Sequence, residues 1–195
     1  ETVDDAAARA EMKFLKGNGT DSAIEGGAVP ASSAGAAAAG VATKQAGKDA
    51  IALESPLEGE AVALSEVPDP IFAAAKLGPG MAVQPAGNAV FAPADGKVLT
   101  VQKSGHAVGL SLDNGVQLLI HVGLDTVELG GVGFDVHVEK KQRISAGDKL
   151  ISFDPEFIRS KGYNLITPVV VTNATKFGAV SGEAGPVTPS DDLLR

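Results

Sequence analysis

The chain has 195 residues, of which 16 are basic and 24 are acidic, and its formal net charge is −8. Nucleic-acid binding needs clustered Lys and Arg, whereas the basic residues here are scattered singly or in pairs such as Lys140–Lys141, so no nucleic-acid partner is expected. The absence of cysteine excludes disulfides, thiolate metal sites and thiol nucleophiles, and this composition fits a cytoplasmic protein.

The N-terminal part differs in composition from the rest of the chain. Residues 1–16 carry helix formers with acids at their start, which predicts a short helix or the tail of a preceding domain. Residues 17–50 are Ala, Gly, Ser and small polar residues without an aromatic, which is typical of a flexible linker; an Ala-rich helix over 34–50 is the alternative. Because the chain begins at Glu1 without a signal-like start, we expect a fragment or a processed chain.

From residue 51 the pattern changes to short apolar runs with β-branched residues, separated by turn signals about every 8–15 residues. This pattern predicts an all-β domain over 51–180, an antiparallel β-sandwich or barrel. Only 70–77 and 154–161 are predicted to form brief helical turns. Because aromatic residues are few, the core is expected to consist of Val, Leu, Ile and Ala.

The C-terminal residues 181–195 give no clear strand pattern. Pro186 and Pro189 interrupt any long pairing there. We therefore expect that the sheet closes differently at this end or that residues 181–195 form a loose tail.

Two of the three histidines flank one alternating apolar segment, residues 106–121. Asn114-Gly115 in its middle is a strong hairpin signal, and we interpret it as a two-residue loop that pairs Val108 with His121. His106 is then a diagonal neighbour of His121 on the same side of the sheet, where two imidazoles can surround a small anion or a metal. A three-residue loop would shift the register by one and send the rings to opposite faces.

Each histidine also has a plainer interpretation. For His106 and His121 the alternative is that they are ordinary half-buried sheet residues. His137 is interpreted as a plain surface or sheet residue. Asp125, four residues beyond His121, either orients an imidazole or only forms a turn.

The sequence closely resembles the glucose-type enzyme IIA domain of the bacterial phosphoenolpyruvate-dependent sugar phosphotransferase system. Five segments carry the resemblance: VPDPIF (67–72), GPGMAVQPAGNAVFAPADGKV (78–98), GHAVGLSLDNGVQLLIHVGLDTVELGGVGF (105–134), GDKLISFD (147–154) and TPVVVTN (167–173). The resemblance implies an antiparallel β-sandwich whose shallow face carries two histidines. It also implies a cytoplasmic phosphotransferase component without a cofactor, at the inner face of the membrane if it is part of a permease.

The same resemblance assigns roles to individual residues. It implies that His121 takes a phosphoryl group from the histidine-containing phosphocarrier protein and passes it to a cysteine of enzyme IIB during sugar uptake. His106 is the neighbour that hydrogen-bonds the phosphate, with Ser104 and Asp125 in supporting roles.

Partner contacts are implied as well. Ile71, Phe72 and Leu119 match an apolar rim on which partner proteins dock, and Asp69 matches an acid near the site; plain packing is the alternative for this set. A membrane permease domain of the same parent chain is a further expected partner, and sugar specificity would reside there.

Three other functions are alternatives to this one, and two of them fit the sequence less well. A lysostaphin-like zinc endopeptidase needs H-x-x-x-D and H-x-H, but Leu110 lies four residues after His106, and Leu119 and Gly123 lie two residues from His121. No intrinsic metal site is therefore predicted, although adventitious zinc between His106 and His121 stays open if a partner supplies a third ligand.

A biotinyl or lipoyl carrier would need a lysine in a signature such as Met-Lys-Met or Asp-Lys-Ala, and neither tripeptide occurs. A pure scaffold or a regulator that binds partners without turnover is compatible with the same residues, because phosphorylation of His121 adds negative charge and can change which partners dock.

Overall fold

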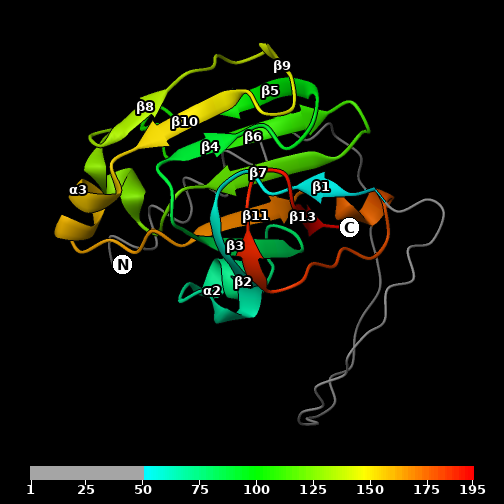
Figure 1. The fold of residues 1–195 in the computed structure, drawn as a ribbon, viewed down its shortest axis with the longest axis horizontal. Helices are drawn as coiled ribbons and strands as arrows, with labels where there is room; N and C mark the ends of the chain where they lie inside the picture. The colour runs from blue at the N-terminus through cyan, green and yellow to red at the C-terminus, as the bar shows by residue number, and fades with distance from the viewer. Residues whose placement is uncertain (1–50) are drawn as a thin grey trace, which may run out of the picture. The chain divides into compact units, whose positions relative to one another are not determined.

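The computed structural model describes residues 51–195, and the predictions for residues 1–16 and 17–50 lie outside this part. Strands dominate the described residues (Figure 1). In chain order the elements are β1 (Leu53–Glu54), β2 (Gly59–Ala63), η1 (Leu64–Glu66), α2 (Pro70–Ala73), β3 (Gly80–Pro85), β4 (Ala89–Phe91), β5 (Gly96–Val101), β6 (Ala107–Leu112), β7 (Gln117–His121), η2 (Thr126–Leu129), β8 (Phe134–Val136), β9 (Arg143–Ile144), β10 (Lys149–Phe153), α3 (Pro155–Ser160), β11 (Thr167–Val171), η3 (Ala174–Lys176), β12 (Gly185–Val187) and β13 (Asp192–Leu194).

All of the strand pairings among these elements are antiparallel, as the sequence predicted. The largest sheet has eight strands in the order β12-β2-β3-β11-β7-β6-β5-β9, which can be followed in Figure 1 from β9 near the top to β2 near the bottom. A second sheet has the order β4-β10-β8, and β1 pairs with β13. No helix within residues 51–195 has the length and apolar character needed to cross a membrane.

Both larger sheets contribute side chains to one apolar core. Strand alternation turns every second residue of β6 and β7 toward it, and β10 adds neighbouring side chains. Each fully buried aliphatic side chain contributes roughly 1.5–3 kcal/mol, so a core of few aromatics is sufficient. These three strands supply Val108, Leu110, Leu118, Ile120, Leu150 and Ile151.

The α-helices α2 and α3 lie inside the predicted helical turns, whereas the 3-10 turns η1, η2 and η3 were not predicted. Both α-helices begin at an Asp-Pro pair, in which the aspartate is the N-cap and the proline is the first helical residue. The Asp69 carboxylate accepts hydrogen bonds from the N–H of Ile71 at 2.7 Å and of Phe72 at 3.0 Å. Asp154 accepts from the N–H of Phe157 at 2.9 Å.

The register of the β6–β7 hairpin differs from the prediction by one residue. Ala107, rather than Val108, is opposite His121, so the loop has three residues, 113–115. Gly115 has a φ of +89°, but Asn114 does not take a positive φ. The predicted two-residue type I′ turn requires positive φ at both positions, whereas a three-residue loop needs only the final glycine there.

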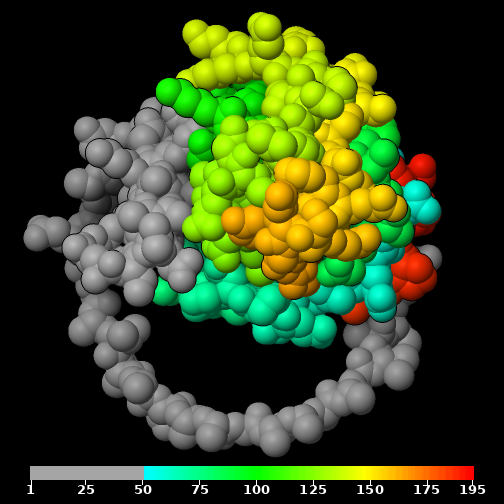
Figure 2. Space-filling model, turned by 90° about the vertical axis from the view of Figure 1, so that its left-hand side faces the viewer, coloured from blue at the N-terminus to red at the C-terminus, as the bar shows by residue number. Residues whose placement is uncertain are grey.

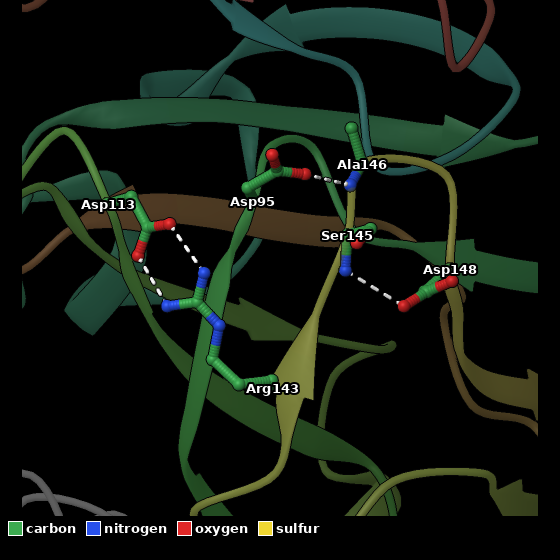
Figure 3. A network of polar contacts seen from close by, with 6 residues as sticks. All are labelled: Asp95, Asp113, Arg143, Ser145, Ala146 and Asp148. Carbon is green, nitrogen blue, oxygen red and sulfur yellow. Dashed lines mark hydrogen bonds and ion pairs between the residues drawn. The ribbon is translucent and has the colours of Figure 1, made fainter.

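Contacts from distant parts of the chain hold the tip of this hairpin. Arg143 donates two hydrogen bonds to Asp113, at 3.0 and 2.8 Å, as Figure 3 shows. Asn173 donates to the Gly115 carbonyl at 2.9 Å and accepts from the N–H of Gln117 at 2.9 Å. In the same view two carboxylates hold the neighbouring turn by accepting N–H bonds: Asp95 from Ala146 and Asp148 from Ser145.

The C-terminal residues are part of the fold, so the predicted loose tail over 181–195 was wrong. β12 pairs with β2 at the edge of the large sheet, and β13 pairs with β1. Because β12 is an edge strand, there is no second neighbouring strand that would need the N–H that Pro186 lacks. Leu193 and Leu194 are 1% and 2% exposed, and burial of these side chains fixes β13.

Candidate functional site

His121 is the last residue of β7 and lies on the face of the large sheet that is turned away from the core. Leu118 and Ile120 of the same strand belong to the core, so alternation sends Leu119 and His121 to the other face. Neither of the latter two side chains belongs to the core cluster. The site therefore lies on the face of the sheet opposite the core, and His121 as a whole residue is 4% exposed.

The rings of His106 and His121 meet, with centroids 4.8 Å apart and planes at 70°. This convergence was expected, although the register from which we derived it was wrong. His106 precedes the first residue of β6 and follows Gly105, which has a φ of +68°, so strand alternation does not determine the direction of its ring. The His106 carbonyl accepts a hydrogen bond from the N–H of Val122 at 2.7 Å, which keeps the two histidines adjacent.

The backbone after β7 fixes the proton of the His121 ring. Its Nδ1 lies 2.7 Å from the Gly123 carbonyl oxygen, which can only accept, so Nδ1 carries the hydrogen and Nε2 carries the lone pair of the neutral ring. Gly123 has a φ of +75°, and a Cβ there would lie 2.6 Å from Thr126 Cγ2 and 2.8 Å from the Asn164 oxygen. Only glycine fits. Sequence reasoning missed this residue, although a glycine two positions after the histidine was a usable signal.

His106 is held by the predicted supporting hydroxyl. Ser104 Oγ lies 2.6 Å from His106 Nδ1, and the imidazole of His106 is wholly buried. When Ser104 donates this hydrogen bond, the neutral ring of His106 carries its proton on Nε2. That nitrogen is then the one able to donate to an anion bound beside the ring.

The four predicted docking residues lie close to this site in different ways. The Phe72 ring packs against the His121 ring with centroids 5.3 Å apart. Phe72 and Leu119 are each 3% exposed, whereas Ile71 is half-buried. Asp69 holds the α2 backbone by capping it, so its carboxylate acts here through the placement of Phe72.

The remaining predicted residues lie outside this cluster or at its margin. Asp125 is exposed in the loop after β7, with a φ of +58°, and its carbonyl accepts from the N–H of Glu128 at 3.1 Å, so the predicted turn is present. His137 is exposed and hydrogen-bonds Ser152 of β10, as expected for a surface residue. Among residues 51–195, no three His, Cys, Asp or Glu side chains are grouped so as to hold a metal ion. Adventitious zinc stays a prediction that needs a ligand from a partner.

Comparison with known proteins places the chain in one family. Residues 51–177 match the family model described as phosphoenolpyruvate-dependent sugar phosphotransferase system, EIIA 1. The chain is 67% identical over 144 residues to the PTS system glucose-specific EIIBCA component of Corynebacterium glutamicum, covering 73% of this chain and 21% of that one. It is 43% identical over 143 residues to the beta-glucoside-specific EIIBCA component of Bacillus subtilis, covering 73% and 24%.

A solved structure supports the same assignment. Glucose permease IIA from Mycoplasma capricolum superposes with a TM-score of 0.70 at 34% identity, covering 74% of this chain and 94% of that one. The chain thus spans nearly all of that solved IIA chain, but only 21% and 24% of the length of the two EIIBCA relatives. The β-sandwich and the family resemblance are both confirmed. The chain belongs to the EIIA 1 family of the phosphoenolpyruvate-dependent sugar phosphotransferase system.

Proposed function

We propose that this chain accepts a phosphoryl group on Nε2 of His121 and passes it on during sugar uptake. The observation that carries the proposal is the 2.7 Å hydrogen bond between His121 Nδ1 and the Gly123 carbonyl. It leaves the lone pair of the neutral ring on Nε2, and such a nitrogen is a nucleophile near pH 7.

The transfer consists of two displacements at phosphorus. In the first, His121 Nε2 attacks the phosphohistidine of the histidine-containing phosphocarrier protein; the new N–P bond forms as the donor's N–P bond breaks, and the donor imidazole recovers its lone pair. In the second, a cysteine thiolate of enzyme IIB attacks the same phosphorus, so that an S–P bond forms and the N–P bond of His121 breaks. The hydrogen on Nδ1 stays in place throughout, and His121 is a carrier.

The other residues of the site position the group and stabilise its charge. Phosphoryl transfer passes through a loose in-line transition state, in which placement and stabilisation of the oxygens account for most of the catalysis. His106, backed by Ser104 at 2.6 Å, is suited to donate a hydrogen bond to a phosphoryl oxygen without adding a fixed positive charge. We assign Asp125 a supporting role through the turn that follows His121.

Partner docking is proposed at the apolar rim beside His121. We assign Ile71, Phe72 and Leu119 to that rim, at which Ile71 is half-buried and Phe72 and Leu119 are each 3% exposed, and Asp69 supports it by capping α2. A small apolar surface of this kind suits a contact that must dissociate after each transfer. Relatives named EIIBCA components support an enzyme IIB domain and a membrane permease domain in the same parent chain, with this domain at the cytoplasmic face.

Phosphorylation with purified components tests the proposal. Incubation with phosphoenolpyruvate, enzyme I and the phosphocarrier protein is expected to add one acid-labile phosphoryl group, detected by mass spectrometry. The gain is expected to disappear in His121→Ala and to persist in the exposed control His137→Ala. A gain that survives in His121→Ala would show that the acceptor is another residue.

A second variant separates loading from onward transfer. In His106→Gln we expect loading to persist while transfer to enzyme IIB falls, because the group that orients the phosphoryl oxygens is changed. Onward transfer at the wild-type rate would remove the role assigned to His106. Partner binding that is unchanged in His121→Ala would favour the alternative of a scaffold that binds partners without turnover.

A further inference from the structure

The segment between α3 and β11 contacts the loop after His121 at two points. The Asn164 carbonyl accepts a hydrogen bond from the N–H of Leu124 at 2.8 Å, and the Tyr163 hydroxyl donates to Glu128 Oε2 at 2.8 Å. In Figure 2 the orange surface of the α3 region adjoins the yellow-green surface of the residues that follow β7. The two contacts lie on either side of the turn at Asp125, so they hold both ends of this loop.

This segment is itself fixed to ordered parts of the fold. The N–H of Tyr163 donates to the carbonyl of Ile158, a core residue of α3, at 3.3 Å. Asn164 Oδ1 accepts from the N–H of Ile166 at 2.9 Å, which shapes the turn into β11. Because β11 pairs with β7, the segment and His121 share one rigid support.

Asn164 also determines where the Gly123 peptide lies. The two residues approach so closely that a Cβ on Gly123 would lie 2.8 Å from the backbone carbonyl oxygen of Asn164. The Gly123 carbonyl is the acceptor that keeps the hydrogen on His121 Nδ1. A displacement of residues 163–164 would therefore shift the Gly123 carbonyl and weaken its hydrogen bond with the His121 ring.

We propose that Tyr163 and Asn164 are positioning residues for phosphoryl acceptance: they hold the loop whose Gly123 carbonyl fixes the tautomer of His121. This inference rests on the proposed role of His121. When the loop relaxes, the Nδ1 hydrogen bond weakens and the ring populates the other tautomer, with its hydrogen on Nε2. In that tautomer Nε2 has no lone pair with which to attack phosphorus.

The electrostatics of Tyr163 agree with this role. Its hydrogen bond to the Glu128 carboxylate raises the pKa of the phenol above 10.0, with further contributions from desolvation and from the charges of Glu128 and Asp125. The hydroxyl therefore remains a neutral donor at the pH of the cell.

Tyr163→Phe tests the inference, because it removes one hydroxyl and leaves the ring in place. A hydrogen bond contributes about 0.5–1.5 kcal/mol net, so we expect the initial rate of phosphorylation to fall about two- to tenfold. The imidazole ¹⁵N spectrum of His121 is expected to shift toward the Nε2–H tautomer. Ser160→Ala removes another exposed hydroxyl, one that donates to the Phe157 carbonyl within α3, and is the matched control with no expected change.

A pair of Asn164 variants checks the side-chain hydrogen bond to Ile166, which shapes the turn and so places the Asn164 carbonyl that contacts the loop. Asn164→Asp keeps an acceptor oxygen for the N–H of Ile166 and is expected to keep the His121 tautomer, whereas Asn164→Ala is expected to shift it. An unchanged tautomer in both Tyr163→Phe and Asn164→Ala, in a protein that still accepts phosphate on His121, would overturn the positioning role alone. A wild-type protein that is not phosphorylated on His121 would overturn the proposed function instead.

Discussion

Gly123→Ala is the single change that should most clearly couple stability to phosphoryl acceptance. The residue has a φ of +75°, and an added Cβ would lie 2.6 Å from Thr126 Cγ2 and 2.8 Å from the Asn164 carbonyl oxygen. The left-handed backbone costs a residue with a Cβ about 1–2 kcal/mol. Overlap with a backbone oxygen, which cannot rotate away, adds about 1–3 kcal/mol.

The expected total is therefore about 2–5 kcal/mol of lost unfolding free energy, measured by urea denaturation. Gly147→Ala is the matched control, because Gly147 has a φ of +85° but nothing within 4 Å of the added Cβ. Gly147→Ala should lose only about 1–2 kcal/mol of unfolding free energy, which is the cost of the left-handed backbone. We also expect Gly123→Ala to accept phosphate more slowly, since its carbonyl is displaced from His121. If the two variants lose the same unfolding free energy and Gly123→Ala is phosphorylated at the wild-type rate, this reasoning is refuted.

Three further predictions concern the rest of the fold. Leu194→Ala should cost about 2–4 kcal/mol in urea denaturation, because this residue is 2% exposed; a loss below about 0.5 kcal/mol would mean that β13 adds little. The raised pKa of Tyr163 should contribute stability that is complete below pH 10.0 and is lost as the pH rises through the folded pKa. The unfolding free energy of Tyr163→Phe, measured at rising alkaline pH, should lack this loss. The same alkaline loss in the variant and in the wild type would contradict the prediction. Arg143→Ala should cost less than about 1 kcal/mol, since the side chains of Arg143 and Asp113 are 70% and 52% exposed; a cost that does not shrink in high salt would contradict this assignment.

Local patterns predicted the antiparallel sheet, whereas the meeting of the two histidines was expected from a hairpin register that proved wrong. Alternation along β6 and β7 separates core residues such as Leu110 and Ile120 from the face that carries His121. The helical turns at 70–77 and 154–161 were also predicted, and the Asp-Pro pair that begins α2 and α3 explains them locally, since a cap and a fixed φ act within one turn.

Features that depend on distant contacts were not predictable in the same way. Asn-Gly is compatible with a two-residue or a three-residue loop, and the observed loop is held by Arg143, 30 residues from Asp113, and by Asn173, 58 residues from Gly115. The Tyr163–Glu128 hydrogen bond joins residues 35 apart. β12 and β13 have three residues each, too few for alternation to show in the sequence.

The central claim is that His121 reacts through Nε2 because the Gly123 carbonyl holds its other nitrogen, at 2.7 Å. The most direct measurement is ³¹P and ¹⁵N NMR of the protein after phosphorylation by the phosphocarrier protein, which identifies the nitrogen bonded to phosphorus. We expect one phosphoryl group on Nε2 of His121, with Nδ1 still bearing its hydrogen. A phosphoryl group on Nδ1 of His121, or on His106, would contradict the account.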